Sequence, residues 1–206
     1  MRGRTQEGLP APTNTAPPPR LPLQQRRRIY IGEVVASTTP LLLQTLLGSC
    51  VAVCLWDPVA CIGGMNHILL PGRGDGEDRP SRYGVHAMEL LINAIMTMGG
   101  VRRKLVAKAF GAGNVVASLQ SPTVGELNAA FVRGFLATER IPLVAQRLGG
   151  LRPVQVNFRT DTGKITVHTV DGSRLPLILS AEDDYRSRLA RTGPGGQVDL
   201  FEGDQR

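Results

Sequence analysis

The chain has 206 residues, enough for one domain with tails, and its apolar fraction of 42% permits a substantial core. The formal net charge is +7, but six of the 24 basic residues and only one of the 17 acidic residues lie within residues 1–28. The rest of the chain is therefore close to neutral. This distribution argues against a basic domain surface that binds nucleic acid.

The cysteines and the start of the chain indicate a compartment. Three cysteines is an odd number for a disulfide framework, and residues 1–28 contain no apolar stretch typical of a secretory signal. No run reaches the roughly 18 apolar residues that a membrane-spanning helix needs. We therefore expect a cytoplasmic protein with free thiols and no membrane insertion.

Residues 1–28 combine six prolines and six arginines with few large apolar side chains. Such a composition cannot bury enough surface to offset the entropy of ordering, so we predict a disordered, basic, Pro-rich tail. Arg26–Arg28 at its end is either a contact for an anionic surface or a solvated flank. The composition favours the flank.

A domain is predicted over residues 29–180, and its first expected strand is Ile29–Ala36. Val51–Trp56 is apolar at every position, as in a strand that is buried on both faces. Asp57–Pro58 interrupts this strand, since proline cannot donate to a ladder. Cys61–Leu70 follows as the expected partner strand.

The spacing of these two strands allows a test of whether Cys50 and His67 can meet. If Asp57–Ala60 form a four-residue hairpin loop, Cys50 falls directly opposite His67. Directly opposed residues share a face with Cβ atoms roughly 4.5–5.5 Å apart, which would let a thiol and an imidazole exchange a proton. A one-residue slip, or a bulge at Gly63–Gly64, would disturb this arrangement.

The remaining elements are two amphipathic helices and several short strands. Helices are expected over Tyr83–Met98 and Thr123–Thr138, where apolar residues recur at helical spacing. Further strands are expected over Lys104–Phe110, Ile141–Gln146, Val154–Arg159, Lys164–Val170 and Leu175–Leu179. Hairpins without regular strand–helix–strand repeats predict an α+β fold, a layered sheet-and-helix sandwich with mixed or antiparallel strands and two long helices. Residues 181–206 are polar, and we predict a flexible C-terminal tail.

Cys54 and Cys61 are interpreted as small buried hydrophobic residues. Cys54 shares a strand face with Cys50, so a zinc site with His67 is an alternative. The spacing of these residues does not match common zinc motifs, however. We therefore expect neither a metal nor a cofactor.

The segment LGSCVAVCLWDP, followed by GGMNHILLPG, resembles the chemoreceptor glutamine deamidases, the CheD family of bacterial chemotaxis. The resemblance covers roughly residues 29–170 and extends to SRYG at 81–84, KAFG at 108–111, Gly125 with Asn128, and LGG at 148–150. It implies a layered fold related to other Cys–His deamidases. It also implies Cys50 as nucleophile, His67 as its partner, and Thr45 as the third residue, with Gln44 as the alternative one position upstream.

The activity that this resemblance implies is the conversion of selected glutamines on the cytoplasmic helices of chemoreceptors to glutamate, which regulates adaptation in chemotaxis. A thiol is mostly protonated at neutral pH, so Cys50 would need His67 to take its proton. Backbone N–H groups of Gly48, Ser49 and Val51 would hold the oxyanion. The resemblance also implies hydrolysis of methyl esters on receptor glutamates and binding to a CheC-type phosphatase.

Two other classes of function remain open from the sequence. A non-catalytic adaptor would keep the fold and bind a receptor or a phosphatase, but the presence of both Cys50 and His67 favours an enzyme. A cysteine protease or transglutaminase is the third class. Release of ammonia without peptide cleavage would distinguish a deamidase from a protease.

Overall fold

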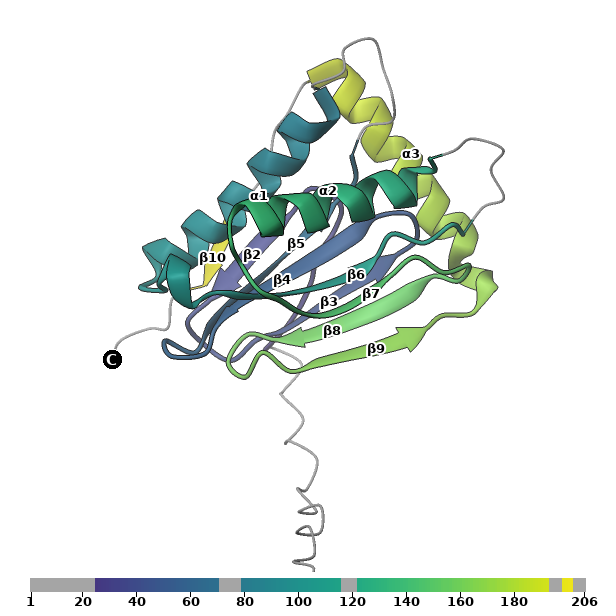
Figure 1. The fold of residues 1–206 in the computed structure, drawn as a ribbon. Coiled ribbons are helices and arrows are strands. Elements are labelled where there is room, and N and C mark those ends of the chain that lie inside the picture. Colours follow the sequence, from purple (N-terminus) through teal and green to yellow (C-terminus); the bar gives the residue numbers. More distant parts are fainter. Residues whose placement is uncertain (1–24, 71–78, 116–121, 193–197, 202–206) are drawn as a thin grey trace, which may run out of the picture.

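A computed structural model describes residues 25–70, 79–115, 122–192 and 198–201. Within these ranges, two sheets and a pair of helices form three layers, and a third helix lies across one end of them (Figure 1). The predicted α+β sandwich is confirmed. The predicted tail residues 1–24 lie outside the described residues.

The larger sheet is the central layer, with the strand order β10-β2-β5-β4-β6-β7. Its strands are β2 (Val34–Ser37), β4 (Val51–Asp57), β5 (Ile62–Ile68), β6 (Val106–Gly111), β7 (Leu143–Leu148) and β10 (Val198–Phe201). β4 pairs antiparallel with both β5 and β6, and all of its residues except Trp56 are buried. The apolar run after Cys50 is therefore a central strand covered on both faces, as predicted.

The smaller sheet has the strand order β1-β3-β8-β9. Its strands are β1 (Arg26–Arg28), β3 (Leu42–Leu47), β8 (Val154–Arg159) and β9 (Ile165–Thr169). β3 alternates between half-buried and buried residues, so Leu43, Thr45 and Leu47 face the larger sheet. An apolar core that includes Cys50, Ala52 and Cys54 fills the space between the sheets.

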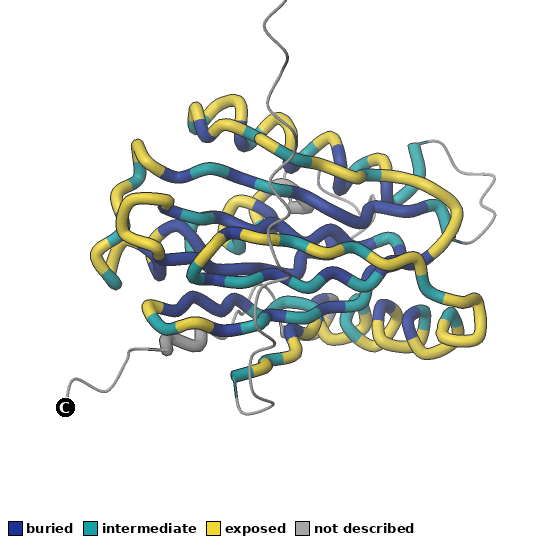
Figure 2. Tube along the Cα trace, turned by 90° about the horizontal axis from the view of Figure 1, so that it is seen from below, coloured by how far each residue is buried: buried dark blue, intermediate teal, exposed yellow. Residues whose placement is uncertain are grey.

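Helices α1 (Arg79–Thr97) and α2 (Val124–Thr138) cover the other face of the larger sheet (Figure 1). Both helices were predicted. α2 begins with a capping box, in which Thr123 and Glu126 each bond the other's backbone N–H. Figure 2 shows that burial is concentrated in the strands. Among the described residues, no helix combines the length and apolar character required to cross a membrane.

The predicted strand Ile29–Ala36 is right only for Val34–Ala36, which lie in β2, because a turn replaces its first part. The backbone N–H of Glu33 donates to the carbonyl of Tyr30, and Gly32 has a φ of +86°, which glycine adopts without strain. β1 ends before this turn and pairs in parallel with β3. Arg26–Arg28 therefore belong to the folded domain, not to the predicted disordered tail.

The register of the β4–β5 hairpin differs from the prediction by two residues. Ala52, not Cys50, lies opposite His67, because the loop begins one residue later than predicted. The side chain of Asp57 accepts hydrogen bonds from two backbone N–H groups of this loop and fixes it. A shift of two residues keeps each side chain on its face. Cys50 and His67 therefore still share a face, as diagonal neighbours.

The C-terminal region differs most from the prediction. The structure has neither a strand over Leu175–Leu179 nor a flexible segment directly after it, because a short 3₁₀ helix, η3 (Gly172–Arg174), leads into α3 (Leu175–Thr192). Pro176 is compatible with a first helical turn. Ile178 and Leu189 are buried on one side of α3. Residues 193–197 and 202–206 of the predicted tail lie outside the described residues.

Candidate active site

Cys50 lies where the chain passes from the smaller sheet to the larger one. It ends the bend that joins β3 to β4, and its side chain is 1% exposed. The three carbonyls of the bend 48–50 accept hydrogen bonds from Gly113, Asn128 and Ala112 at 2.6–2.9 Å. These bonds hold the bend rigidly and therefore fix the position of the thiol.

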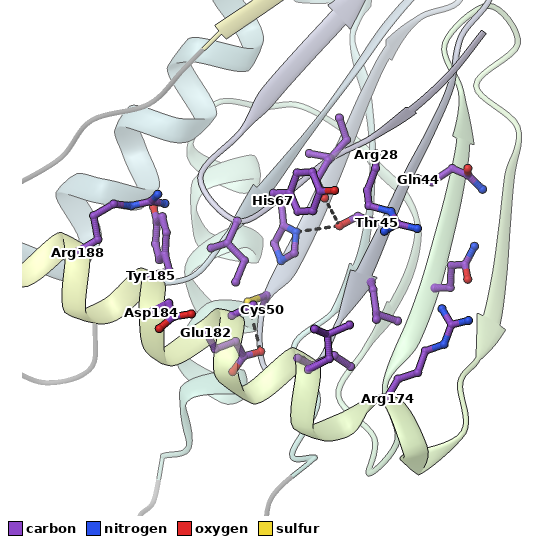
Figure 3. Close-up of a pocket in the computed structure, with 18 residues that line it drawn as sticks. Arg28, Gln44, Thr45, Cys50, His67, Arg174, Glu182, Asp184, Tyr185 and Arg188 are labelled. Carbon is purple, nitrogen blue, oxygen red and sulfur yellow. Dashed lines mark hydrogen bonds between the residues drawn. The ribbon is translucent and has the colours of Figure 1, made fainter. Parts of the chain in front are cut away.

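His67 comes from β5 and Thr45 from β3, so the two side chains approach from opposite sheets. Thr45 is the polar member of the inward row of β3, and its Oγ1 lies 2.8 Å from Nδ1 of His67 (Figure 3). The backbone of His67 is held as well, because its N–H donates to Glu33 and its carbonyl accepts from Gly32. The imidazole is thereby fixed in position and in rotation.

The hydrogen bonds of Thr45 determine the tautomer of His67. The hydroxyl of Thr45 donates to the carbonyl of Ile29 at 2.8 Å, and a carbonyl can only accept. The same hydroxyl therefore accepts from Nδ1–H of His67. The lone pair then resides on Nε2, which is buried and has no hydrogen-bond partner among the described residues. This nitrogen is the basic atom available to the site.

Gln44 takes no part in this contact. Adjacent residues of a strand point to opposite faces, and the amide of Gln44 donates to Asn157 of β8 at 2.7 Å. Thr45 is the member of the predicted pair of alternatives that touches His67.

Both reacting groups are neutral in this structure. Burial lowers the pKa of His67 to about 4, although the nearby carbonyl of Ile29 opposes this shift. Burial also raises the pKa of Cys50 well above its usual range, and the carboxylate of Glu182 raises it further. A thiol and an imidazole, not an ion pair, therefore occupy the site.

A pocket of about 490 Å³ lies between the sheets and α3, and Thr45, Cys50 and His67 line it. From α3, Glu182 enters this pocket (Figure 3). Its Oε1 accepts from the backbone N–H of Ser49 at 2.9 Å and from the thiol of Cys50 at 3.4 Å, and its Oε2 accepts from the hydroxyl of Ser49 at 2.6 Å. Glu182 has no signature in the sequence, because residues 181–206 are polar and predict a tail.

The three predicted oxyanion residues differ in position. The N–H of Ser49 faces the pocket, since it donates to Glu182. Gly48 lies beneath α3, where an added Cβ would approach Ile178 to 2.8 Å. Val51 lies in β4 and is paired with both neighbouring strands, β5 and β6. Of the three, Ser49 is therefore the residue whose N–H donates to a side chain that lines the pocket.

Asn128 of α2 connects the two strands that carry the reacting groups. Its amide donates to the carbonyl of Ser49 at 2.9 Å, and its Oδ1 accepts from the backbone N–H of Leu70 at 2.9 Å. The side chain is fully buried. It therefore ties the bend before Cys50 to the segment after β5. The family resemblance had pointed to Asn128 without giving it a role.

The other two cysteines lie apart from this pocket. Cys54 is buried, which raises the pKa of its thiol, whereas Cys61 is exposed in the β4–β5 loop, contrary to its predicted burial. In the described part of the chain, no three His, Cys, Asp or Glu side chains form a group that could hold a metal ion.

Comparisons with known proteins match this chain to one family. Residues 69–169 match the family model described as CheD chemotactic sensory transduction. A protein of Stenotrophomonas maltophilia (strain K279a) named "Probable chemoreceptor glutamine deamidase CheD" is 45% identical over 169 residues, covering 82% of this chain and 84% of the relative. A relative with the same printed name from Thiobacillus denitrificans is 43% identical over 178 residues, covering 84% and 88%.

A further relative, from Shewanella oneidensis, is named "Probable chemoreceptor glutamine deamidase CheD 1" and is 43% identical over 180 residues, covering 84% of this chain and 86% of its own. Among solved structures, the Bacillus licheniformis hypothetical protein YfiH shares 15% identity at a TM-score of 0.38, covering 57% of this chain and 49% of its own, a likeness too weak to support any conclusion. The identity to the curated relatives extends over most of both chains. The chain therefore belongs to the CheD family.

Proposed function

We propose that this chain is a protein-glutamine deamidase that converts glutamine side chains of chemoreceptors to glutamate and so regulates adaptation in chemotaxis. The relatives' printed names support the substrate and the reaction. The arrangement of Thr45, His67 and Cys50 around one pocket supports the mechanism.

The hydrogen bond between Thr45 and His67 is the observation that supports the proposed mechanism most directly. It leaves Nε2 of His67 as an unprotonated, unpartnered base inside the pocket that Cys50 also lines. A positioned third group that orients a base is the general arrangement of nucleophilic acyl transfer. Thr45 would fill this role as a positioning residue, and the imidazole would be the group that moves protons.

The first half of the reaction forms a thioester. Nε2 of His67 takes the proton of the Cys50 thiol, and Sγ adds to the carbonyl carbon of the substrate amide. The carbonyl oxygen becomes an oxyanion, which the N–H of Ser49 stabilises. The imidazolium then gives its proton to the amide nitrogen, the carbon–nitrogen bond breaks, and ammonia leaves.

The second half regenerates the enzyme. His67, again neutral, takes a proton from water, and the resulting hydroxide attacks the thioester carbon. The carbon–sulfur bond breaks, glutamate is released, and the thiolate of Cys50 recovers its proton from the imidazolium. In balance, one amide and one water give one carboxylate and one ammonium ion. Methyl esters of receptor glutamates have the same electrophilic carbon and are a second proposed substrate.

The proposed substrate places the protein on the cytoplasmic side of the receptor, and the proposed location is therefore the cytoplasm. A CheC-type phosphatase is a proposed partner on the basis of family membership.

Incubation of the full chain with the cytoplasmic fragment of a chemoreceptor tests the proposal. Peptide mass mapping should show the mass increase of an amide-to-acid conversion at selected glutamines. Ammonia should be released, and the receptor backbone should stay intact. Cys50→Ala should show no conversion. Receptor cleavage, or conversion that continues in Cys50→Ala, would contradict the proposal.

A further inference from the structure

Helix α3 blocks the pocket in which the proposed chemistry takes place. Glu182 is a side chain of α3 that contacts both Ser49 and Cys50, and it is 2% exposed. Two atoms of Ser49 and the thiol of Cys50 donate to its carboxylate, and Arg186 of the same helix lies 3.5 Å from Oε2. A charged side chain that is buried against a candidate nucleophile needs an explanation beyond packing.

The surface beneath α3 is shaped to accept one face of a helix. Ile178, Glu182 and Tyr185 follow one another at intervals of four and three residues, so they lie on one side of α3. An added Cβ at Gly48 would approach Ile178 to 2.8 Å and Glu182 to 2.9 Å. An added Cβ at Gly32 would approach the ring of Tyr185 to 2.7 Å. The absence of side chains at these two glycines lets the helix come close to the nucleophile.

The chemistry of Glu182 matches the product of the proposed reaction. Deamidation of glutamine yields glutamate, and Glu182 presents such a side chain to Cys50. Its Oε1 accepts from the N–H of Ser49, the donor that would hold the oxyanion, and it is also the oxygen that contacts the thiol. A substrate amide whose oxygen occupied this place would have its carbonyl carbon next to Sγ.

We infer that α3 is an intramolecular pseudosubstrate: Glu182 occupies the place of the reacting side chain, and the surface beneath α3 is the docking site for a helical substrate. This inference rests on the proposed function. It deepens that function by assigning the surface on which the substrate helix docks. It also assigns a closed state, in which the thiol proton is held by Glu182 and no substrate can enter.

The spacing on α3 gives this docking site a recognition pattern. Ile178 precedes Glu182 by four residues and Tyr185 follows it by three; Ile178 lies against Gly48 of the bend before β4, and Tyr185 lies against Gly32 of the turn before β2. A substrate helix that used the same surface would place apolar side chains at these offsets from its reacting glutamine. Among the α3 residues whose burial is described, Ile178 and Leu189 are the only buried apolar side chains, so little apolar contact opposes displacement of the helix.

The decisive variant is Glu182→Gln, which turns the blocking side chain into a potential substrate of its own active site. We expect the introduced amide to be converted to a carboxylate at a rate that does not depend on protein concentration. Peptide mass mapping of position 182 measures this conversion. The double variant Glu182→Gln with Cys50→Ala should retain the amide. Ser180→Gln places the same amide at an exposed position of α3 and should also retain it.

A second variant, Glu182→Ala, tests the block itself with a receptor cytoplasmic fragment as substrate. We expect deamidation to be about tenfold faster than in the unmodified chain, the change expected if the closed state holds roughly nine molecules in ten. Ser180→Ala, at the same exposed position as the control above, should deamidate the fragment at the unmodified rate.

The two readouts separate the two proposals. If the receptor fragment is deamidated but the amide of Glu182→Gln persists and Glu182→Ala is no faster, the pseudosubstrate assignment is wrong and the deamidase function stands. Conversion of the introduced amide without conversion of the receptor would support α3 as a pseudosubstrate and refute the receptor as substrate. Failure of both would refute the deamidase function and the inference with it.

Discussion

Asp57 and His67 are both buried polar residues of the β4–β5 hairpin and lie at opposite ends of it. They differ in whether every polar atom of the side chain has a hydrogen-bond partner. Every partner that Asp57 needs comes from backbone N–H groups: Val59 and Ala60 donate to Oδ1, and Val101 donates to Oδ2, all at 2.8–3.0 Å. His67 has a partner for Nδ1 but none for Nε2, which is also buried.

The pKa values of the two residues express the same difference. Burial raises the pKa of Asp57, but the backbone N–H donors outweigh burial and hold it below its ordinary value, so the charged form is stabilised. For His67, burial dominates and lowers the pKa to about 4, so the neutral form is stabilised. A buried group with every partner supplied serves the fold, whereas a buried group with one unmet atom beside a pocket is available for chemistry.

The largest effect is expected at the nucleophile that His67 serves. Cys50→Ala should reduce deamidation of a receptor fragment to the uncatalysed level, because no other thiol lies at the Ser49 bend. The melting temperature should change little, since only one sulfur atom is lost. Ammonia release and thermal unfolding measure the two properties.

Cys54→Ala is the matched control for this variant, because Cys54 lies on the same strand face and is equally buried. It should retain activity and, like Cys50→Ala, change the melting temperature only slightly, since the same single sulfur atom is lost. Turnover that survives Cys50→Ala but not Cys54→Ala would show that the nucleophile is assigned to the wrong cysteine.

At the other end of the hairpin, Asp57→Ala should have the opposite effect, because it should lower stability and leave turnover unchanged. Three backbone N–H groups lose their acceptor, so the free energy of unfolding should fall by about 3 kcal/mol. The turnover of the molecules that remain folded should not change, because Asp57 is remote from the pocket. Denaturant unfolding gives the first value, and activity per folded molecule gives the second. Asp183→Ala, on the exposed side of α3, is a control that should change stability by less than about 0.5 kcal/mol.

Thr45→Ala should lower turnover by about 100-fold, which corresponds to ~2.7 kcal/mol of transition-state stabilisation. The nucleophile and the Ser49 donor remain, and only the orientation and tautomer of His67 are lost. Thr45→Ser keeps the hydroxyl and should recover much of the rate, which a purely structural role would not explain. Gln44→Ala should change turnover very little, since the Gln44 amide donates a hydrogen bond to Asn157 and not to His67. Equal losses in Gln44→Ala and Thr45→Ala would contradict the orienting role.

The parts of the fold that the sequence predicted are those that local pattern determines. The apolar run of β4 and the helical periodicity of α1 and α2 each arise from residues near one another in the chain. The β4–β5 register was missed by two residues because Asp57 ends β4 and its side chain starts the loop one position later. Even so, Cys50 and His67 lie on the same face, as predicted, because side chains of a strand return to the same face every two residues.

The closed pocket could not be predicted in the same way. The contact between Cys50 and Glu182 joins residues 132 positions apart, and no local pattern marks a glutamate as buried. The apolar residues of α3 are concentrated in Leu175–Leu179, and the residues that follow are mostly polar, so the segment has the pattern of a short strand followed by a tail. Because Glu182 itself provides the contact with Ser49 and Cys50, the apolar pattern of α3 does not show which of its residues reaches the nucleophile.

The smallest expected effect is a difference between Asp57 and His67 in how their contributions to folding stability depend on pH. The pKa of His67 lies near 4 in the folded protein and at its ordinary 6.5 when unfolded, so the unfolded state binds the proton more readily. Stability from this group is complete above pH 6.5 and is lost as the pH falls toward 4. Between about pH 7.5 and about pH 5 the loss should be about 2 kcal/mol.

Asp57 should contribute nothing to the change over that interval. Its pKa is lowered from an ordinary value of 3.8, so its stabilisation persists above that pH and is lost only at more acidic values. His67→Gln therefore isolates the histidine, because this variant should lose about 2 kcal/mol less than the unmodified chain over the same interval. Denaturant unfolding at the two pH values measures the difference. Parallel losses in both proteins would show that the imidazole of His67 is not held neutral by burial, and the distinction from Asp57 would then rest on geometry alone.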